Sequence, residues 1–132
     1  MSGCGGPKNI KTIDFNFQAD EKSNGERPVH VMIREVSKKS FLTETYADVA
    51  DMVYAEPREK SLLAVRVILP GGKERVTLDV NKPDDVNIGV YGMFSEPGKS
   101  WRLILETPLE KKYTIRIKGN ALECDNVAVT AD

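Results

Sequence analysis

The sequence has few of the residues on which catalytic and metal sites depend. One histidine and two cysteines among 132 residues exclude a zinc site built from several Cys and His ligands. His30 lies inside a predicted strand, which argues against a histidine-based catalytic triad. A calcium loop is disfavoured because Pro83 stands where its third ligand should be, and the neighbouring Asp84 and Asp85 are better explained as turn residues. We therefore predict no enzymatic activity, no metal, no cofactor and no small-molecule substrate.

Two further absences bear on partners and location. The net charge of -1 gives no concentrated basic surface, so we expect no nucleic-acid partner. No apolar run approaches the ~20 residues of a membrane-spanning helix, and Met1-Ser2-Gly3 is too short to be a signal peptide. The length suffices for one domain with its own core. We predict a flexible tether over residues 1–9 and a single domain over residues 10–132.

What the sequence does have is alternation of apolar and polar residues. Between Leu62 and Glu106 four runs alternate with a period of two, which predicts half-buried strands. The breaks between them are short, and short breaks join antiparallel neighbours, so we predict a four-strand meander. The alternating apolar residues are Leu63, Val65, Val67 and Leu69; Val76, Leu78 and Val80; Val86, Ile88 and Val90; and Trp101, Leu103 and Leu105.

Four more alternating runs bring the count to eight. They span Ile10 to Ala19, Val29 to Val36, Lys112 to Lys118, and Val127 to Thr130. The pattern predicts an all-β fold, an eight-stranded antiparallel β-sandwich. A closed small barrel is the alternative, and the strand pattern alone does not separate the two.

Alternation stops between Ser37 and Leu62. Four apolar residues recur there at helical spacing: Tyr46, Val49, Ala50 and Val53. Thr45 followed by Asp48 resembles a capping box, and Pro57 ends the helix. We predict one amphipathic helix inserted between strands two and three, which covers one open end of the core.

Cys4 stands in an unusual context of small residues. Gly5, Gly6 and Pro7 favour neither a stable helix nor a central strand, so we interpret them as a tether. Three interpretations of the cysteine stay open. The first is a free thiol at the chain terminus. The second is the acylated first residue of a mature bacterial lipoprotein, because the small residues Ser2-Gly3 directly precede Cys4. The third is a disulfide bond with Cys124.

The loop between the first two strands is the other functional candidate. It contains only polar residues and glycine: Asp20, Glu21, Lys22, Ser23, Asn24, Gly25, Glu26 and Arg27. A solvated loop is the ordinary interpretation of such a composition. A partner-contacting loop held out by two strands is the functional one, because binding residues concentrate on loops over rigid scaffolds.

The order of these segments resembles the TssJ family of type VI secretion lipoproteins, also called SciN or VasD. The likeness runs from about Cys4 to Pro108. It departs from the family pattern at His30 and Met32, and the tail after Pro108 does not align. The matching segments are Cys4, the PVHVMIREV strand at residues 28–36, the helical segment at residues 40–53, ILPGGK at residues 68–73, IGVYGMF at residues 88–94, and Trp101-Arg102.

The resemblance implies a transthyretin-like sandwich with a structural role. A lipid on Cys4 would anchor it at the periplasmic face of the outer membrane, and Gly5 lacks the aspartate linked with inner-membrane retention. The loop at residues 20–27 would bind the periplasmic C-terminal region of TssM, a large inner-membrane protein. The alternative is an extracytoplasmic module that binds carbohydrate or peptide on an aromatic platform of Tyr91, Trp101 and Tyr113.

Overall fold

The computed structural model describes residues 10–57 and 60–125, and the account below concerns these residues. They form eight strands, two α-helices and one short 3-10 helix. In chain order the elements are β1 (Ile10–Ala19), η1 (Ser23–Gly25), β2 (Val29–Val36), α1 (Lys38–Thr43), α2 (Tyr46–Val53), β3 (Leu62–Ile68), β4 (Lys73–Asn81), β5 (Asn87–Met93), β6 (Arg102–Leu105), β7 (Lys112–Lys118) and β8 (Ala121–Cys124).

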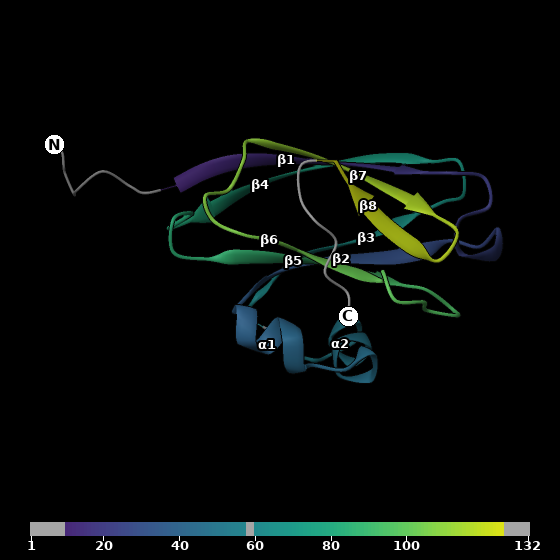
Figure 1. Ribbon diagram of the computed structural model, residues 1–132, viewed down its shortest axis with the longest axis horizontal. Helices are drawn as coiled ribbons and strands as arrows, with labels where there is room; N and C mark the ends of the chain where they lie inside the picture. Colours follow the sequence, from purple (N-terminus) through teal and green to yellow (C-terminus); the bar gives the residue numbers. More distant parts are fainter. Residues whose placement is uncertain (1–9, 58–59, 126–132) are drawn as a thin grey trace, which may run out of the picture.

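The fold has three layers, two sheets and a pair of helices (Figure 1). The upper sheet, here called the outer sheet, has the strand order β4-β1-β7-β8. The lower sheet, the middle sheet, has the order β3-β2-β5-β6, and the helices lie beneath it. The predicted all-β sandwich is confirmed, and the barrel alternative is wrong because the two sheets are separate in the described residues.

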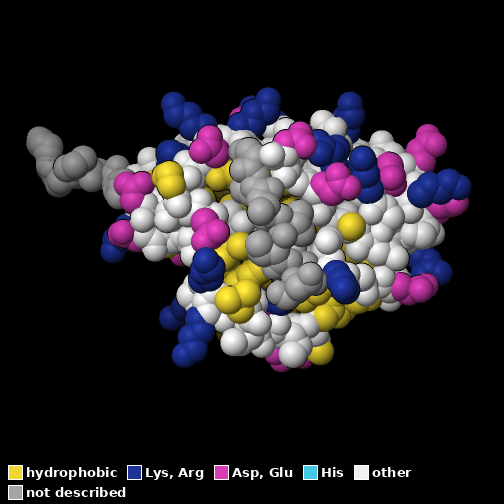
Figure 2. Space-filling model, viewed as in Figure 1, with side chains coloured by type: hydrophobic (Ala, Val, Ile, Leu, Met, Phe, Trp, Pro, Cys, Tyr) yellow, Lys and Arg dark blue, Asp and Glu magenta, His cyan; other side chains and the backbone are white. Residues whose placement is uncertain are grey.

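The outer sheet follows the alternation read from the sequence. Ile13, Phe15 and Phe17 of β1 point into the core and are at most 1% exposed. In the adjacent strands Val76, Ile115 and Ile117 are buried in the same way. The other face meets water, and Figure 2 shows acidic and basic side chains intermixed along that upper edge. Because one face of this sheet meets water and the other faces the core, apolar and polar residues alternate regularly along its strands.

The strand order differs from the predicted meander. β4 pairs with β1 instead of β3, and β5 pairs with β2 instead of β4. β1 and β7 run parallel, so the sandwich is not wholly antiparallel. Of the four central strands, only β5 and β6 are hydrogen-bonded neighbours. The β3–β4 and β4–β5 connections cross between the sheets, and loop length alone does not distinguish a crossing from a hairpin.

The middle sheet is covered on both faces over β2, β5 and β6. In β2 Val31 and Ile33 face the other sheet, but Met32 on the opposite face is also fully buried. β5 and β6 are buried along almost their whole length. In β3 the buried residues are Leu62, Ala64 and Ile68, whereas in the predicted alternating set Leu63 and Val65 are only partly buried and Val67 and Leu69 are exposed. The apolar face predicted for β3 is therefore the wrong one.

Two short helices replace the single predicted helix. Thr45 caps α2 through a complete capping box with Asp48, as predicted, and Val49 is fully buried. α1 is a separate turn capped by Ser37, and its Phe41 is fully buried. The helices cover the outer face of the middle sheet (Figure 1) instead of lidding one end of the core.

Two predictions at the chain ends concern residues outside the described ranges. These are the tether over residues 1–9 and the strand from Val127 to Thr130. The eighth strand of the structure is β8, which pairs with β7 and includes Cys124.

Candidate partner-binding site

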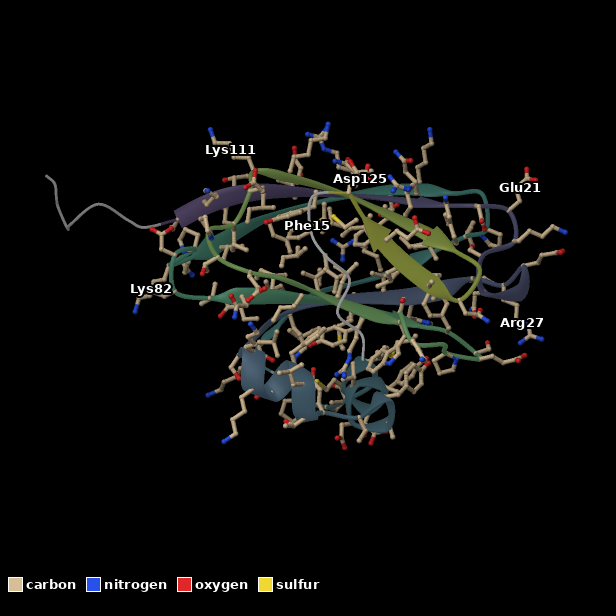
Figure 3. The ribbon with its side chains drawn as sticks, viewed as in Figure 1. Phe15, Glu21, Arg27, Lys82, Lys111 and Asp125 are labelled. Carbon is tan, nitrogen blue, oxygen red and sulfur yellow. The ribbon has the colours of Figure 1, made fainter. Side chains whose placement is uncertain are left out.

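The predicted partner-contacting loop, residues 20–27, joins β1 to β2 at one end of the sandwich. Figure 3 labels Glu21 and Arg27 at this end, and Lys82 and Lys111 at the opposite end. β1 begins at the end that carries Lys82 and Lys111 and runs to the loop (Figures 1 and 3). The loop and the start of the described chain therefore lie at opposite ends of the domain.

Asn24 fastens this loop to its neighbours. Its side-chain oxygen accepts a hydrogen bond from the backbone N–H of Ser95 at 2.8 Å. Its side-chain amide donates to the carbonyl of Pro28, also at 2.8 Å, and its backbone N–H donates to Gly119. Asn24 is only 4% exposed. One residue thus ties the loop to the β5–β6 connection and to the β7–β8 turn.

The backbone around Asn24 needs unusual residues. Asn24, Gly25 and Glu26 have φ of 51°, 62° and 64°, in the left-handed region. Asparagine and glycine enter this region at low cost, whereas glutamate does so less readily. The Asn-Gly pair is therefore the sequence signal for the tight turn that buries Ser23 and Asn24.

A second set of bonds holds the start of the loop against the β3–β4 turn. The N–H of Gly71 donates to the carbonyl of Asp20 at 3.0 Å, and the N–H of Ala19 donates to Gly72 at 2.9 Å. The Asp20 carboxylate accepts from the N–H of Lys22 at 3.1 Å. The loop is thus part of a rigid end surface, which differs from the ordinary solvated loop.

Six of the eight loop residues are exposed and carry charges of both signs. Lys22 and Glu26 approach to 3.6 Å with their side chains 81% and 67% exposed, so their attraction is strongly screened. Such charges influence association rate and specificity more than affinity. Ser23 and Asn24 are buried, and the assignment of the loop as a partner-binding site stays a prediction.

The sequence interpretation missed a buried polar network between the helices and the middle sheet. Glu44, between α1 and α2, accepts from Nη1 of Arg34 at 2.9 and 2.6 Å and from the Tyr91 hydroxyl at 2.6 Å. Arg34 also donates from Nε to the Ser61 hydroxyl at 3.2 Å. Arg102 donates to the carbonyls of Phe41 and Glu44.

The electrostatics of this network follow from its burial. Burial raises the pKa of Tyr91, and the neighbouring Glu44 raises it further, so the hydroxyl stays protonated and donates. Burial lowers the pKa of Arg34, but its hydrogen bonds and charge interactions with Glu44 and Tyr91 together outweigh the burial, so the pKa is raised. The network fastens the helix pair to β2, β5 and β6. These groups are bonded to one another and to the backbone of the helix pair, so we assign the network a structural role.

The aromatic platform of the alternative hypothesis does not form. Tyr91 is fully buried, Trp101 is 8% exposed and Tyr113 is 1% exposed. Trp101 packs edge-on against Tyr46 of α2, with ring centroids 4.9 Å apart, instead of facing the core with Leu103. Tyr113 stacks on Phe15 in the outer sheet. The three rings therefore do not make one exposed surface.

One groove does contain two carboxylates, Glu35 and Asp85, and has a volume of about 460 Å³. Its other polar groups have structural partners. Ser61 accepts from Arg34, the Ser37 hydroxyl caps α1 and Lys38 pairs with Glu106 at 3.2 Å. In residues 10–57 and 60–125 no cluster of three or more His, Cys, Asp or Glu residues is arranged to hold a metal. No helix in these ranges is long and apolar enough to cross a membrane.

The other predicted site residue, Cys4, lies outside the described residues, so its acylation stays a prediction. Cys124 lies in β8 and is 6% exposed.

Several solved structures resemble this fold, and three of them are described here. A chain in the structure described as "T6SS protein TssM C-terminal domain (869-1107) from EAEC" is 23% identical with a TM-score of 0.70, and the match covers 89% of this protein and 99% of that chain. The T6SS lipoprotein TssJ1 from Pseudomonas aeruginosa is 15% identical with a TM-score of 0.64, covering 94% of this protein and 100% of that chain. A chain of a "Type VI membrane complex" is 27% identical with a TM-score of 0.65, covering 88% and 98%.

Comparison at the level of sequence families gives a direct assignment. No curated protein matches the chain significantly. The family described as IglE, N-terminal domain, matches residues 30–117, well over half of the sequence. The match spans β2 to β7, including the helix pair. The chain therefore belongs to the IglE N-terminal domain family, and its fold is the one that the solved type VI secretion lipoprotein structures share.

Proposed function

We propose that this protein is a non-enzymatic scaffold of the type VI secretion membrane complex. It is anchored in the outer membrane, on the periplasmic side, by acyl chains on Cys4. Through the loop at residues 20–27 it binds the periplasmic C-terminal region of a TssM-like inner-membrane protein. The observation that carries this proposal is the rigid, charged loop at the far end of the domain from the start of β1.

The shape of the domain supports this arrangement. β1 spans ten residues, and at 3.2–3.4 Å per residue it places its two ends about 30 Å apart. A lipid attached before β1 would leave the loop pointing away from the membrane surface. The loop would then be accessible to a protein that reaches across the periplasm.

The comparison with the TssM structure supports the choice of partner. Since this 132-residue protein covers 99% of the matched chain, that chain is shorter than the range 869–1107 in its description. We take the matched chain to be a TssJ-type partner of the TssM domain. On that interpretation, we expect this protein to form an equivalent complex with the C-terminal domain of a TssM-like protein.

Charge reversal of the loop tests the partner assignment. Lys22→Glu with Arg27→Glu leaves Asn24 in place, and we expect roughly tenfold weaker binding to the periplasmic domain of a TssM-like protein. Calorimetric titration of the purified domains measures the affinity. Lys82→Glu with Lys111→Glu, at the opposite end, is the matched control and should bind like the wild type. Equal affinities for the two variants would contradict the loop assignment.

The anchor has a separate test. In cells that express the natural precursor, Cys4→Ser should move the protein from the membrane fraction to the soluble periplasmic fraction. A single acyl chain binds membranes only marginally, whereas several chains anchor stably. Cys124→Ser is the control and should stay with the membranes. If Cys4→Ser also stays there, the lipid assignment is wrong.

A further inference from the structure

The loop alone is too small to be a complete partner-binding surface. A specific protein interface buries about 800 Å² on each partner and involves about 20–30 residues. The loop exposes six residues, and all but Gly25 carry charged side chains. Charged residues are typical of an interface rim, whereas the centre is apolar and contains most of the binding energy. An interface built on this loop therefore needs an apolar centre beside it.

Such a centre lies next to the loop on the outer face of β3. Val67 lies near the end of β3, Leu69 directly follows the strand, and their side chains are 50% and 60% exposed. Val67 pairs across the strands with His30 of β2. The His30 ring contacts that of Tyr54, which follows α2 and is 75% exposed, with centroids 5.9 Å apart. We call Tyr54, His30, Val67 and Leu69 the apolar strip.

The strip is unusual for this protein. Only five large hydrophobic residues of the described chain are strongly exposed, and three of them belong to the strip. A groove of about 360 Å³ between α2 and β5 adjoins it, lined by His30 and Tyr54 together with Met93 and Phe94. Contiguous exposed apolar surface of this kind marks a binding site more often than scattered single residues do.

Two connections make the strip continuous with the loop. The turn after Leu69 is bonded to the loop through the N–H of Gly71 and the carbonyl of Asp20, 3.0 Å apart. At the other side, Ser95 lines the groove and donates its N–H to Asn24. The same hydrogen bonds that make the loop rigid therefore fix its position relative to the strip.

We infer that the apolar strip is the centre of the partner-binding surface and that the charged loop is its rim. The occupant is the protein partner of the loop, which supplies apolar side chains for Leu69, Val67 and the groove beside Tyr54. This inference rests on the proposed function, because it assigns more of the same interface to the same partner. It makes Asn24 a positioning residue that sets the loop against the strip.

The test is the triple variant Tyr54→Ser, Val67→Thr and Leu69→Ser. The three side chains are at least half exposed, so we expect the variant to fold, with an unchanged circular dichroism spectrum. Its affinity for the TssM-like periplasmic domain should fall on the order of a hundredfold. The control is Leu42→Ser, which removes a 54%-exposed leucine of α1 outside the strip and should leave affinity unchanged.

The outcomes separate this inference from the function on which it rests. If the triple variant binds like the wild type while the loop charge reversal weakens binding, the strip is not the centre and the proposed function stands. If the wild type does not bind the TssM-like domain at all, both are wrong. If the wild type self-associates in sedimentation experiments and the triple variant is monomeric with unchanged partner affinity, the strip is a contact between copies and the inference is overturned.

Discussion

The two sheets of the sandwich differ in how many of their faces are covered. The outer sheet has one face in the core and one in water, whereas the middle sheet lies between the core and the helix pair. Each sheet has an ion pair between an arginine and a carboxylate. Arg75 and Asp14 pair at 2.8 Å on the outer sheet with the arginine side chain 68% exposed. Arg34 and Glu44 pair at 2.6 Å beneath the middle sheet with side chains 9% and 10% exposed.

This difference determines what each pair does for the fold. An exposed ion pair is screened by water and contributes little. A buried pair contributes weakly in net terms, but removal of one partner leaves an uncompensated charge in the interior. The middle sheet is therefore the part of the molecule that is sensitive to single polar substitutions, and three predictions test that contrast.

The largest expected effect is that of Glu44→Ala. The substitution leaves the Arg34 guanidinium without its carboxylate and removes the acceptor of the Tyr91 hydroxyl. We expect the free energy of unfolding to fall by about 3–5 kcal/mol. Urea denaturation followed by circular dichroism measures it. Arg75→Ala, which breaks the exposed pair of the outer sheet, is the control and should unfold almost like the wild type. Equal losses would contradict the contrast.

The next effect is steric, at Gly89 in the middle sheet. A Cβ there would lie 2.5 Å from the Tyr91 hydroxyl oxygen and 2.7 Å from its ring. Tyr91 is fully buried and bonded to Glu44, so its ring has little room to move. We expect Gly89→Ala to cost about 1–3 kcal/mol of unfolding free energy. Gly98→Ala, whose Cβ would come no closer than 4.0 Å to another residue, is the matched control for urea denaturation.

The smallest effect is a pH dependence on the wet face of the outer sheet. The Thr77 hydroxyl and then Arg75 donate hydrogen bonds to Asp14 and hold its pKa below the ordinary value of 3.8. A lowered folded-state pKa stabilises the protein above the unfolded value, and this contribution is lost as pH falls through the folded value. Asp14→Asn should therefore be slightly less stable than the wild type at pH 6.

Thermal unfolding across pH measures this difference, which should shrink below a pH of about 4. Asp51→Asn, at an exposed position of α2, is the control. A gap between Asp14→Asn and the wild type that does not change with pH would show that the carboxylate charge is not its cause.

The sequence was informative where local chemistry decides the structure. The inward residues of β1, β4 and β7 were predictable because one face of their sheet is wet. The capping box of Thr45 and Asp48 was predictable because its two hydrogen bonds lie within four residues. In β3 the face predicted from the alternation was wrong, because Val67 and Leu69 lie on a face that no described element covers fully.

The candidate site shows the same division. Composition located the charged loop, but only the fold revealed that Asn24 joins it to Ser95 and Gly119 through hydrogen bonds. The buried network of Arg34, Glu44 and Tyr91 was equally hidden. Its members are up to 57 residues apart in the chain, and nothing in the local pattern joins them.

By itself, then, the sequence determined the strands with one wet face, the capped helix, the charged loop and the likeness to the TssJ lipoproteins. Each depends on periodicity, on short-range hydrogen bonds or on the linear order of segments. The tertiary structure decided which strands pair, which face of β3 is exposed and that the loop lies beside an apolar strip. Those features depend on contacts between segments that are distant in the sequence, so no short stretch of residues is enough to predict them.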